Sequence, residues 1–301
     1  MRLLVVGANG MLGHDVLRAG ERAGHELVGV DLPEIDITDM DSVEGVLERV
    51  AGEAGGLDGL VNCAAWTDVD GAERNEAAAR AVNAEGAGIL ARSCARVRVP
   101  MVHVSTDYVF DGSPPLDEDG SRRPYVESDP TGPRSAYGRT KLEGEQQVKA
   151  ASPKHAIART AWLYGVDGKN FVQTMLSLAG EREAVQVVTD QIGSPTWSGH
   201  LAPALLGLLE RGVTGLVHLT GGGQVSWNGF AKEIFRQAEV RCRVEDATSE
   251  QMARPAPRPA WSAMESERDD VLPMPPWQDG LAGYMAMRAG IVRAERETLA
   301  K

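Results

Sequence analysis

The N-terminal sequence is the feature that most restricts the fold of this chain. Leu3–Val6 is a continuous apolar run followed at once by Gly7-Ala-Asn-Gly10-Met-Leu-Gly13, and helix-compatible sequence then continues to about Ala23. A continuous apolar run is typical of a parallel strand buried on both faces. Glycines between a strand and a helix allow a tight turn and let the backbone approach a pyrophosphate. We therefore expect the chain to begin with a dinucleotide-binding unit.

The same alternation of strands and helices continues through the first half of the chain. The expected strands are 27–30, 60–62, 101–104 and 155–159, and the expected helices are 42–50, 72–97 and 135–149. This order predicts an α/β fold with a Rossmann-type, doubly wound parallel sheet. The pattern is less regular later, with helices expected at 171–178, 201–209 and 230–238 and strands at 185–188 and 216–219. We expect a dinucleotide-binding domain over 1–164 and a smaller substrate-binding lobe over 165–301, with some later segments returning to the sheet.

Composition and charge limit the classes of partner. The net charge of −12 disfavours binding to a nucleic-acid backbone. No apolar stretch approaches the length of a transmembrane helix, so no membrane partner is expected. The three cysteines are far apart and form no CxxC pair, which is typical of reduced thiols in a cytoplasmic protein. The six histidines show no metal-ligand spacing, and we predict no metal site.

Tyr137 and Lys141 indicate the chemistry. In a helix, residues four apart share one face. A Lys ammonium beside a phenol favours the phenolate, so we expect the pKa of Tyr137 to be lowered. Such a tyrosine can exchange a proton with a carbonyl oxygen near neutral pH. Beside a bound dinucleotide, this pair predicts carbonyl reduction or alcohol oxidation.

Other candidate residues follow the predicted strands, at the carboxyl edge where open α/β sheets bind ligands. Asp31 ends the second strand, where an acid usually holds the adenosine ribose and disfavours a 2′-phosphate, so NADH is a candidate beside NADPH. Ser105–Asp107 ends the fourth strand, and a hydroxyl there can hold a substrate carbonyl against Tyr137. Trp162 follows the fifth strand, where it stacks on a base or sugar or packs in the core.

The predicted cofactor contacts lie mainly in the turns after these strands. Small residues after the third strand let the chain pass under a cofactor, and Asp36-Ile37 is a candidate edge for the adenine. Asn83 lies in the long predicted helix, where it either supports the active-site backbone or is a surface amide. The candidate cofactor-binding residues are Gly7, Asn9, Gly10, Met11, Leu12, Gly13, Asp31, Asp36, Ile37, Ala64, Ala65, Thr67, Asn83, Ser105, Tyr137 and Lys141.

Longer strings carry a resemblance to a known family. They are GANGMLG at 7–13, VNCAAWTDVDGAE at 61–73, STDYVFDG at 105–112, YGRTKLEGE at 137–145, RTAWLYG at 159–165 and TDQIGSPTW at 189–197. In this order, over nearly the whole chain, the sequence resembles the extended short-chain dehydrogenase/reductases. It is most similar among them to the dTDP-4-dehydrorhamnose reductase family. STDYVFDG and DQIGSPT are the specific strings, whereas GxxGxxG and YxxxK identify only the superfamily.

The resemblance implies a reaction and a role for each catalytic residue. NADPH or NADH would deliver hydride to C4 of dTDP-4-dehydro-L-rhamnose, and Tyr137 would protonate the resulting alkoxide to give dTDP-L-rhamnose. Lys141 would bind the nicotinamide ribose and tune Tyr137, while Thr106 would hold the carbonyl. The resemblance implies a catalytic triad of Thr106, Tyr137 and Lys141. The substrate-binding residues implied are Thr106, Asp107, Tyr108, Tyr137 and Trp162.

The sequence departs from one feature of this family. Some members bridge a dimer through a metal held by acidic side chains. Asp15 is one candidate position, but no acid stands at 197–200, where the other would fall. We therefore expect no metal-bridged dimer, and the sequence leaves a homodimer of another kind open.

Three alternative functions share parts of this pattern. A sugar-nucleotide 4,6-dehydratase would need Asp then Glu after the catalytic Thr, and here Asp107 is followed by Tyr108. A reductase of another nucleotide-linked 4-keto-deoxysugar would carry the same catalytic residues. A non-catalytic regulatory subunit resembling the β subunit of methionine adenosyltransferase is also compatible with them, although the whole-chain match favours an enzyme.

Overall fold

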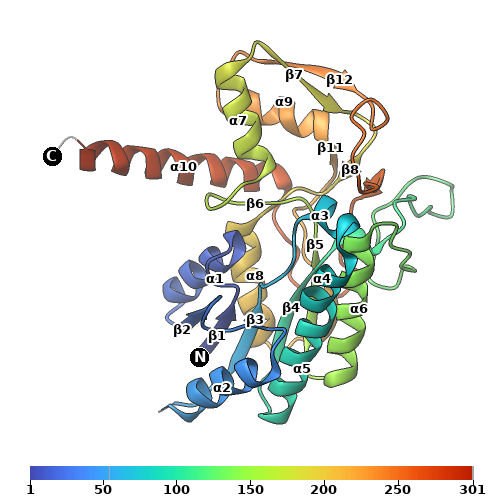
Figure 1. Cartoon of the computed structure of the whole chain (residues 1–301). Coiled ribbons are helices and arrows are strands. Elements are labelled where there is room, and N and C mark those ends of the chain that lie inside the picture. Colours follow the sequence, from blue (N-terminus) through green and yellow to red (C-terminus); the bar gives the residue numbers. More distant parts are fainter. Residues whose placement is uncertain (54, 300–301) are drawn as a thin grey trace.

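The computed structural model describes residues 1–53 and 55–299, with side chains described up to Ile291. Its centre is a six-stranded parallel sheet of order β10-β5-β4-β3-β1-β2 (Figure 1). The predicted Rossmann-type α/β fold is therefore confirmed. The strands of this sheet are β1 (Arg2–Val6), β2 (Glu26–Val30), β3 (Gly59–Asn62), β4 (Met101–Thr106), β5 (Ala156–Thr160) and β10 (Gly215–His218).

Helices cover both faces of this sheet because its strands are apolar on both faces. Successive side chains of a strand point to opposite faces. Leu3 and Val5 accordingly pack in one buried cluster, with side chains of α1 (Met11–Arg22) and α8 (Ser198–Glu210). Leu4 and Val6 pack in another, with side chains of α2 (Met40–Gly52), α5 (Ala87–Arg96) and α6 (Ala136–Ala151).

The later part of the chain builds a second group of elements above the sheet in Figure 1. Its buried cluster includes Tyr164, Phe230 and Tyr284. Two late elements belong instead to the first sheet, because β10 pairs with β5 and α8 packs on α1. The other elements are α7 (Phe171–Glu181), α9 (Trp227–Gln237), α10 (Trp277–Leu299), β6 (Leu163–Tyr164), β7 (Ala184–Val188), β8 (Ile192–Gly193), β9 (Thr196–Trp197), β11 (Val225–Ser226), β12 (Arg243–Ala247) and β13 (Trp261–Ser262).

The prediction of one continuous helix over 72–97 is wrong. It is divided into α3 (Val69–Arg74), α4 (Glu76–Arg80), a π-helical segment η1 (Ala81–Gly86) and α5. Asn75 breaks the helix with φ −146° and ψ 67°, and its side chain accepts a hydrogen bond from Ala78 N. Asparagine favours such breaks because its amide bonds nearby backbone. Across the described ranges, no helix is long and apolar enough to span a membrane.

Candidate active site

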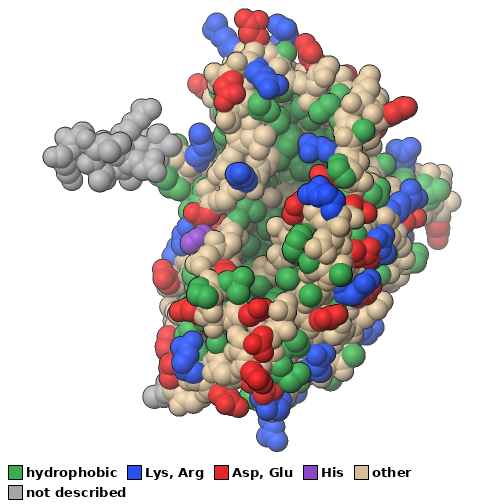
Figure 2. Space-filling view, in the orientation of Figure 1, with side chains coloured by type: hydrophobic (Ala, Val, Ile, Leu, Met, Phe, Trp, Pro, Cys, Tyr) green, Lys and Arg blue, Asp and Glu red, His purple; other side chains and the backbone are tan. Residues whose placement is uncertain are grey.

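A cavity of about 980 Å³ lies at the carboxyl end of the six-stranded sheet. It is bordered by the segments that follow β1, β2, β3, β4 and β5. The chain runs from β1 to β2 on one side and then crosses to β3 on the other, so the loops after β1 and β3 diverge. Such a switch point is where open α/β sheets bind ligands. Figure 2 shows the surface hollowed between the sheet and the elements above it.

The glycine turn borders this cavity and depends on the absence of side chains. Gly7 has φ +79°, and a Cβ there would lie 2.6 Å from Ala64 N. A Cβ on Gly13 would lie 2.2 Å from Gly7 O. The N-cap residue of α1, Gly10, makes no side-chain cap. The first N–H groups of α1 lack intrahelical partners, and a helix N-terminus of this kind favours anions.

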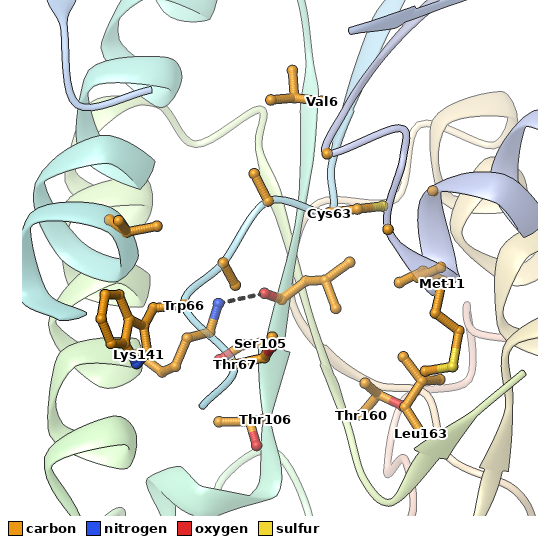
Figure 3. Close-up of a pocket in the computed structure, with 18 of the residues that line it drawn as sticks. Val6, Met11, Cys63, Trp66, Thr67, Ser105, Thr106, Lys141, Thr160 and Leu163 are labelled. Carbon is orange, nitrogen blue, oxygen red and sulfur yellow. Dashed lines mark hydrogen bonds between the residues drawn. The ribbon is translucent and has the colours of Figure 1, made fainter. Parts of the chain in front are cut away.

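The predicted catalytic residues meet on the opposite wall of the cavity. Ser135 caps α6, since its hydroxyl accepts a hydrogen bond from Gly138 N at 3.1 Å, and α6 brings both Tyr137 and Lys141 to the cavity. Thr106 ends β4 on the same wall (Figure 3). The structure thus brings the three residues together from two elements that are neighbours in space.

The expected lowering of the Tyr137 pKa is wrong. Burial raises the pKa of Tyr137 to about 12, and a hydrogen bond with Thr106 offsets this only in part. The Lys141 amine points to β4 instead, where Nζ donates to Val104 O at 2.7 Å (Figure 3). Burial also lowers the pKa of Lys141 to about 8. The cost of burying a charge therefore outweighs the attraction between phenolate and ammonium that the spacing suggested.

Asp107, next to Thr106, is a buried carboxyl group with a raised pKa. Its Oδ1 accepts a hydrogen bond from Thr106 Oγ1 at 2.9 Å. Its Oδ2 is buried and has no hydrogen-bond partner among the described residues. Burial raises the pKa of Asp107 to about 6. Asp107 also lines the cavity, and a buried polar atom without a partner is rare in a folded protein.

Asp31 borders the other end of the cavity, as its position after the second strand predicted. Its carboxylate accepts hydrogen bonds from Asn9 N at 3.0 Å and from Leu32 N at 2.8 Å. Nearby, Thr38 donates to Asp36 through its N–H and hydroxyl, and these bonds lower the pKa of Asp36. Two acidic side chains are thus held rigidly where the predicted adenosine end would lie.

Trp162 forms a rigid side of the cavity. It has φ +48° and stacks on Trp227 with ring centroids 3.5 Å apart. Its indole N–H donates to Ser262 Oγ at 3.0 Å. A Cβ on Gly193 would lie 2.4 Å from the indole, so this glycine leaves the space that the ring occupies. The stack on Trp227 and the hydrogen bond to Ser262 hold the ring in one orientation.

Two of the predicted cofactor residues, Asn9 and Asn83, do not line the cavity. Asn9 contributes its backbone N–H to Asp31. Asn83 in η1 accepts from Trp66 N at 2.8 Å and donates to Trp66 O at 3.2 Å, so it supports the loop after β3. The remaining candidates line it: Gly7, Gly10, Met11, Leu12, Gly13, Asp31, Asp36, Ile37, Ala64, Ala65, Thr67, Ser105, Thr106, Asp107, Tyr108, Tyr137, Lys141 and Trp162.

Sequence reasoning missed several residues that border the cavity. Cys63 and Trp66 belong to the loop after β3, and their place at the carboxyl edge was a signal that could have found them. Gly168 and Lys169 come from a turn beyond β6 that carried no such signal. Thr160, the last residue of β5, also lines the cavity.

Asp15, the candidate metal position, is hydrogen-bonded to other side chains of the protein. Its carboxylate accepts hydrogen bonds from Arg18 Nη2 at 2.8 Å and from Ser198 Oγ. Within 1–53 and 55–299, no group of three or more His, Cys, Asp or Glu side chains is arranged to hold a metal ion. These contacts assign Asp15 to the packing of α1 against α8.

Comparison with known proteins agrees with this site. Residues 1–289 match the family described as RmlD substrate binding domain. The dTDP-4-dehydrorhamnose reductase of Mycobacterium tuberculosis is 43% identical over 302 residues, covering 98% of this chain and 96% of the relative. The dTDP-4-keto-6-deoxy-D-glucose reductase of Streptomyces niveus is 42% identical, covering 87% of this chain and 88% of the relative.

A solved structure gives the same result. The dTDP-4-dehydrorhamnose reductase of Bacillus anthracis, determined in complex with NADP, aligns with a TM-score of 0.89 at 35% identity, covering 95% of this chain and 99% of that one. The resemblance read from the sequence is therefore confirmed. This chain belongs to the RmlD substrate binding domain family, together with dTDP-4-dehydrorhamnose reductases.

Proposed function

We propose that this protein is a dTDP-4-dehydrorhamnose reductase, which reduces the C4 keto group of dTDP-4-dehydro-L-rhamnose with NAD(P)H and forms dTDP-L-rhamnose. One observation carries the proposal. Thr106, Tyr137 and Lys141 border the same cavity as the glycine turn of α1, so a proton donor faces a dinucleotide site across one space. The names of its relatives support the same reaction.

The residues at the adenosine end fit a dinucleotide. The backbone packs too closely at Gly7 and Gly13 to admit a Cβ, and this packing sets the N-terminus of α1, which favours a pyrophosphate, beside the cavity. Asp31 would hold the ribose of the adenosine. When bound, the nicotinamide supplies the hydride. The loop after β3, held by Asn83, would form the floor beneath the cofactor.

The raised pKa of Tyr137 suits the direction of reduction. A phenol with a pKa of about 12 is protonated at neutral pH and can give its proton to the C4 alkoxide. Thr106 would hold the carbonyl oxygen near this phenol, so that the substrate need not move between hydride transfer and proton transfer. The charge of Lys141 would stabilise the tyrosinate left behind. Asp107, Tyr108 and Trp162 would bind the sugar.

The proposal is tested by following absorbance at 340 nm with dTDP-4-dehydro-L-rhamnose generated in the same tube. NADH and NADPH are run separately. Substrate-dependent loss of absorbance supports the reductase and gives the cofactor preference. No loss with either cofactor, in protein shown to bind one of them, contradicts it.

A second candidate is reduction of another nucleotide-linked 4-keto-deoxysugar. The 42% identity to the dTDP-4-keto-6-deoxy-D-glucose reductase of Streptomyces niveus favours it. Both sugars present a C4 ketone to the same catalytic residues, so the geometry of those residues does not separate them. The same assay with dTDP-4-keto-6-deoxy-D-glucose does, because the true substrate will have the higher kcat/KM.

Two further parts of the proposal concern the cell and assembly. We propose a cytoplasmic location, which the free thiols of Cys63, Cys94 and Cys242 support. A homodimer is the assembly to test first, by light scattering of the purified protein. A monomer mass at the assay concentration would remove the dimer from the proposal.

We expect Asp31→Ala to shift cofactor preference towards NADPH. The carboxylate borders the cavity and would repel a 2′-phosphate, so its removal should raise the NADPH-to-NADH affinity ratio about five- to tenfold. Fluorescence titration with each cofactor measures the ratio. Glu34→Ala, which removes an exposed acid outside the cavity lining, is the matched control. An equal shift in both variants would assign the effect to overall charge rather than to Asp31.

We expect Trp162→Phe to weaken sugar-nucleotide binding. The change removes the indole hydrogen bond to Ser262 and part of the stack on Trp227, so KM for the sugar nucleotide should rise roughly 5- to 30-fold. Cofactor affinity should stay within twofold, or about 0.4 kcal/mol. Trp197→Phe, at a position outside the cavity lining, is the control. An unchanged KM for Trp162→Phe would remove this residue from the sugar site.

A further inference from the structure

The amine of Lys141 is held by two groups of β4 rather than by water. Nζ donates to Val104 O at 2.7 Å and lies 3.3 Å from His103 Nε2. Lys141 and His103 are each only 1% exposed. Because water does not reach either nitrogen, one of the two must donate a hydrogen bond and the other must accept it.

Asn62 determines which nitrogen of His103 carries the hydrogen. The Asn62 Oδ1 atom accepts a hydrogen bond from Ala64 N at 3.0 Å, so the amide nitrogen is the atom turned towards His103. Asn62 Nδ2 lies 3.0 Å from His103 Nδ1. An amide NH2 only donates, so Nδ1 must accept and is unprotonated. A neutral His103 therefore carries its hydrogen on Nε2, the atom that faces Lys141.

This orientation has a direct consequence for Lys141. An ammonium group has donors and no acceptor, so it would place its own hydrogens against the Nε2–H of His103. A neutral amine has one lone pair. It can accept from His103 Nε2 while it donates to Val104 O, and both short contacts are then hydrogen bonds.

We propose that His103, oriented by Asn62, is a positioning residue that disfavours the ammonium form of Lys141 and so lowers the pH at which Lys141 loses its charge. The inference deepens the proposed function and takes its catalytic meaning from it, because the charge of Lys141 would stabilise the Tyr137 phenolate. His103 itself does not line the cavity, so it would act through Lys141.

Two other titratable groups, Glu145 and Cys63, act on Lys141. Glu145 on the same helix favours the ammonium, but its carboxylate is shared by Arg159 and Ser105. Cys63 also faces Lys141, and burial raises the pKa of its thiol to about 12, so it is uncharged at neutral pH. Burial lowers the pKa of Lys141 to about 8 and holds that of His103 well below its usual range. These directions agree with a neutral His103 beside a Lys141 that loses its proton more readily than a lysine in water.

The first test uses the unmodified protein and nuclear magnetic resonance. The chain has six histidines and six lysines, so each set of side-chain signals is small enough to assign. Ring ¹⁵N shifts should identify His103 as the neutral Nε2–H form throughout the neutral range. Lysine ¹³Cε shifts should show Lys141 titrating near pH 8, the value of its lowered pKa. A His103 that carries its hydrogen on Nδ1 would overturn the proposal.

The second test changes the donor. In His103→Gln, the side chain can turn its carbonyl oxygen to Nζ, so the Lys141 midpoint should rise by about one pH unit, the equivalent of one hydrogen bond. His155→Gln is the control, since His155 is also buried but bonds Met101 N and Ala91 O. If His103→Gln does not fold, Asn62→Asp serves, because its carboxylate would accept from Nδ1–H and release Nε2 as an acceptor for Lys141.

The outcomes separate this inference from the proposed function. The titration needs neither cofactor nor sugar, so a failed reductase assay leaves its result standing. An equal Lys141 midpoint in the wild type and in His103→Gln overturns the inference while leaving the reductase intact. If both hold, kcat/KM falls at high pH as Lys141 loses its proton, and that limb moves upward with the midpoint in His103→Gln but not in His155→Gln.

Discussion

Replacing Tyr137 with phenylalanine is expected to lower kcat for the keto sugar by about 10²- to 10⁴-fold, the usual contribution of a general acid. The phenol borders the cavity beside Thr106, and its raised pKa of about 12 keeps it protonated for transfer. Phenylalanine retains the ring and its edge-to-face contact with Tyr108, whose centroid lies 5.4 Å away. Cofactor affinity should therefore change little. Steady-state rates at 340 nm and a fluorescence titration with NADPH measure the two quantities.

Tyr108→Phe is the matched comparison for this experiment. It removes a second phenol from the same cavity, and burial raises the pKa of Tyr108 so that it also stays protonated. We expect it to alter KM for the sugar nucleotide more than kcat. A kcat near that of the wild type in Tyr137→Phe, or an equal loss in both variants, would remove Tyr137 from its role as the proton donor.

Glu145→Gln is expected to destabilise the fold by about 3–5 kcal/mol, because it leaves a buried arginine without its counter-charge. Arg159 Nε and Nη2 donate to the two oxygens of Glu145 at 2.9 and 2.7 Å, and the side chains are only 4% and 6% exposed. Ser105 Oγ donates to the same carboxylate at 2.6 Å. Urea unfolding followed by circular dichroism measures the free energy of unfolding.

The control for this prediction removes both charges. Glu145→Leu with Arg159→Met should recover most of the loss, because a buried ion pair can be replaced by apolar groups at little cost. Glu233→Ala, which breaks the solvent-accessible pair with the exposed Arg236, should have little effect. Glu145→Gln as stable as the wild type would show that the buried guanidinium does not depend on this carboxylate.

Much of the fold could be predicted because its signals are local. The apolar runs at Leu3–Val6 and 101–104 are strands of the sheet, and the glycine turn follows the first of them. Local signals do not predict a helix boundary where a side chain competes with the helix for backbone hydrogen bonds. The alanine-rich sequence predicts one continuous helix, but Asn75 interrupts it because its amide caps α4.

The sequence predicted those site residues whose place depends only on the end of a strand or the face of a helix. Thr106, Tyr137 and Trp162 reached the cavity for that reason. Asn83 did not, because the π-helical segment turns its amide to the backbone of Trp66. Lys169 was missed because it enters the cavity from a turn far along the chain, and no local pattern predicts which distant turn will fold over a site.

The sequence by itself determined the α/β order, the glycine turn, the pairing of Tyr137 with Lys141 on one helix face and the family. Each depends on spacing along the chain, which backbone geometry converts directly into position. Only the tertiary structure decided the protonation of the site. Burial raised the pKa of Tyr137 and lowered that of Lys141. These shifts arise from loss of solvent, which depends on how many separate segments of the chain pack around a group. The contact of Lys141 on α6 with His103 on β4 is an example, because no local pattern in the sequence predicts it.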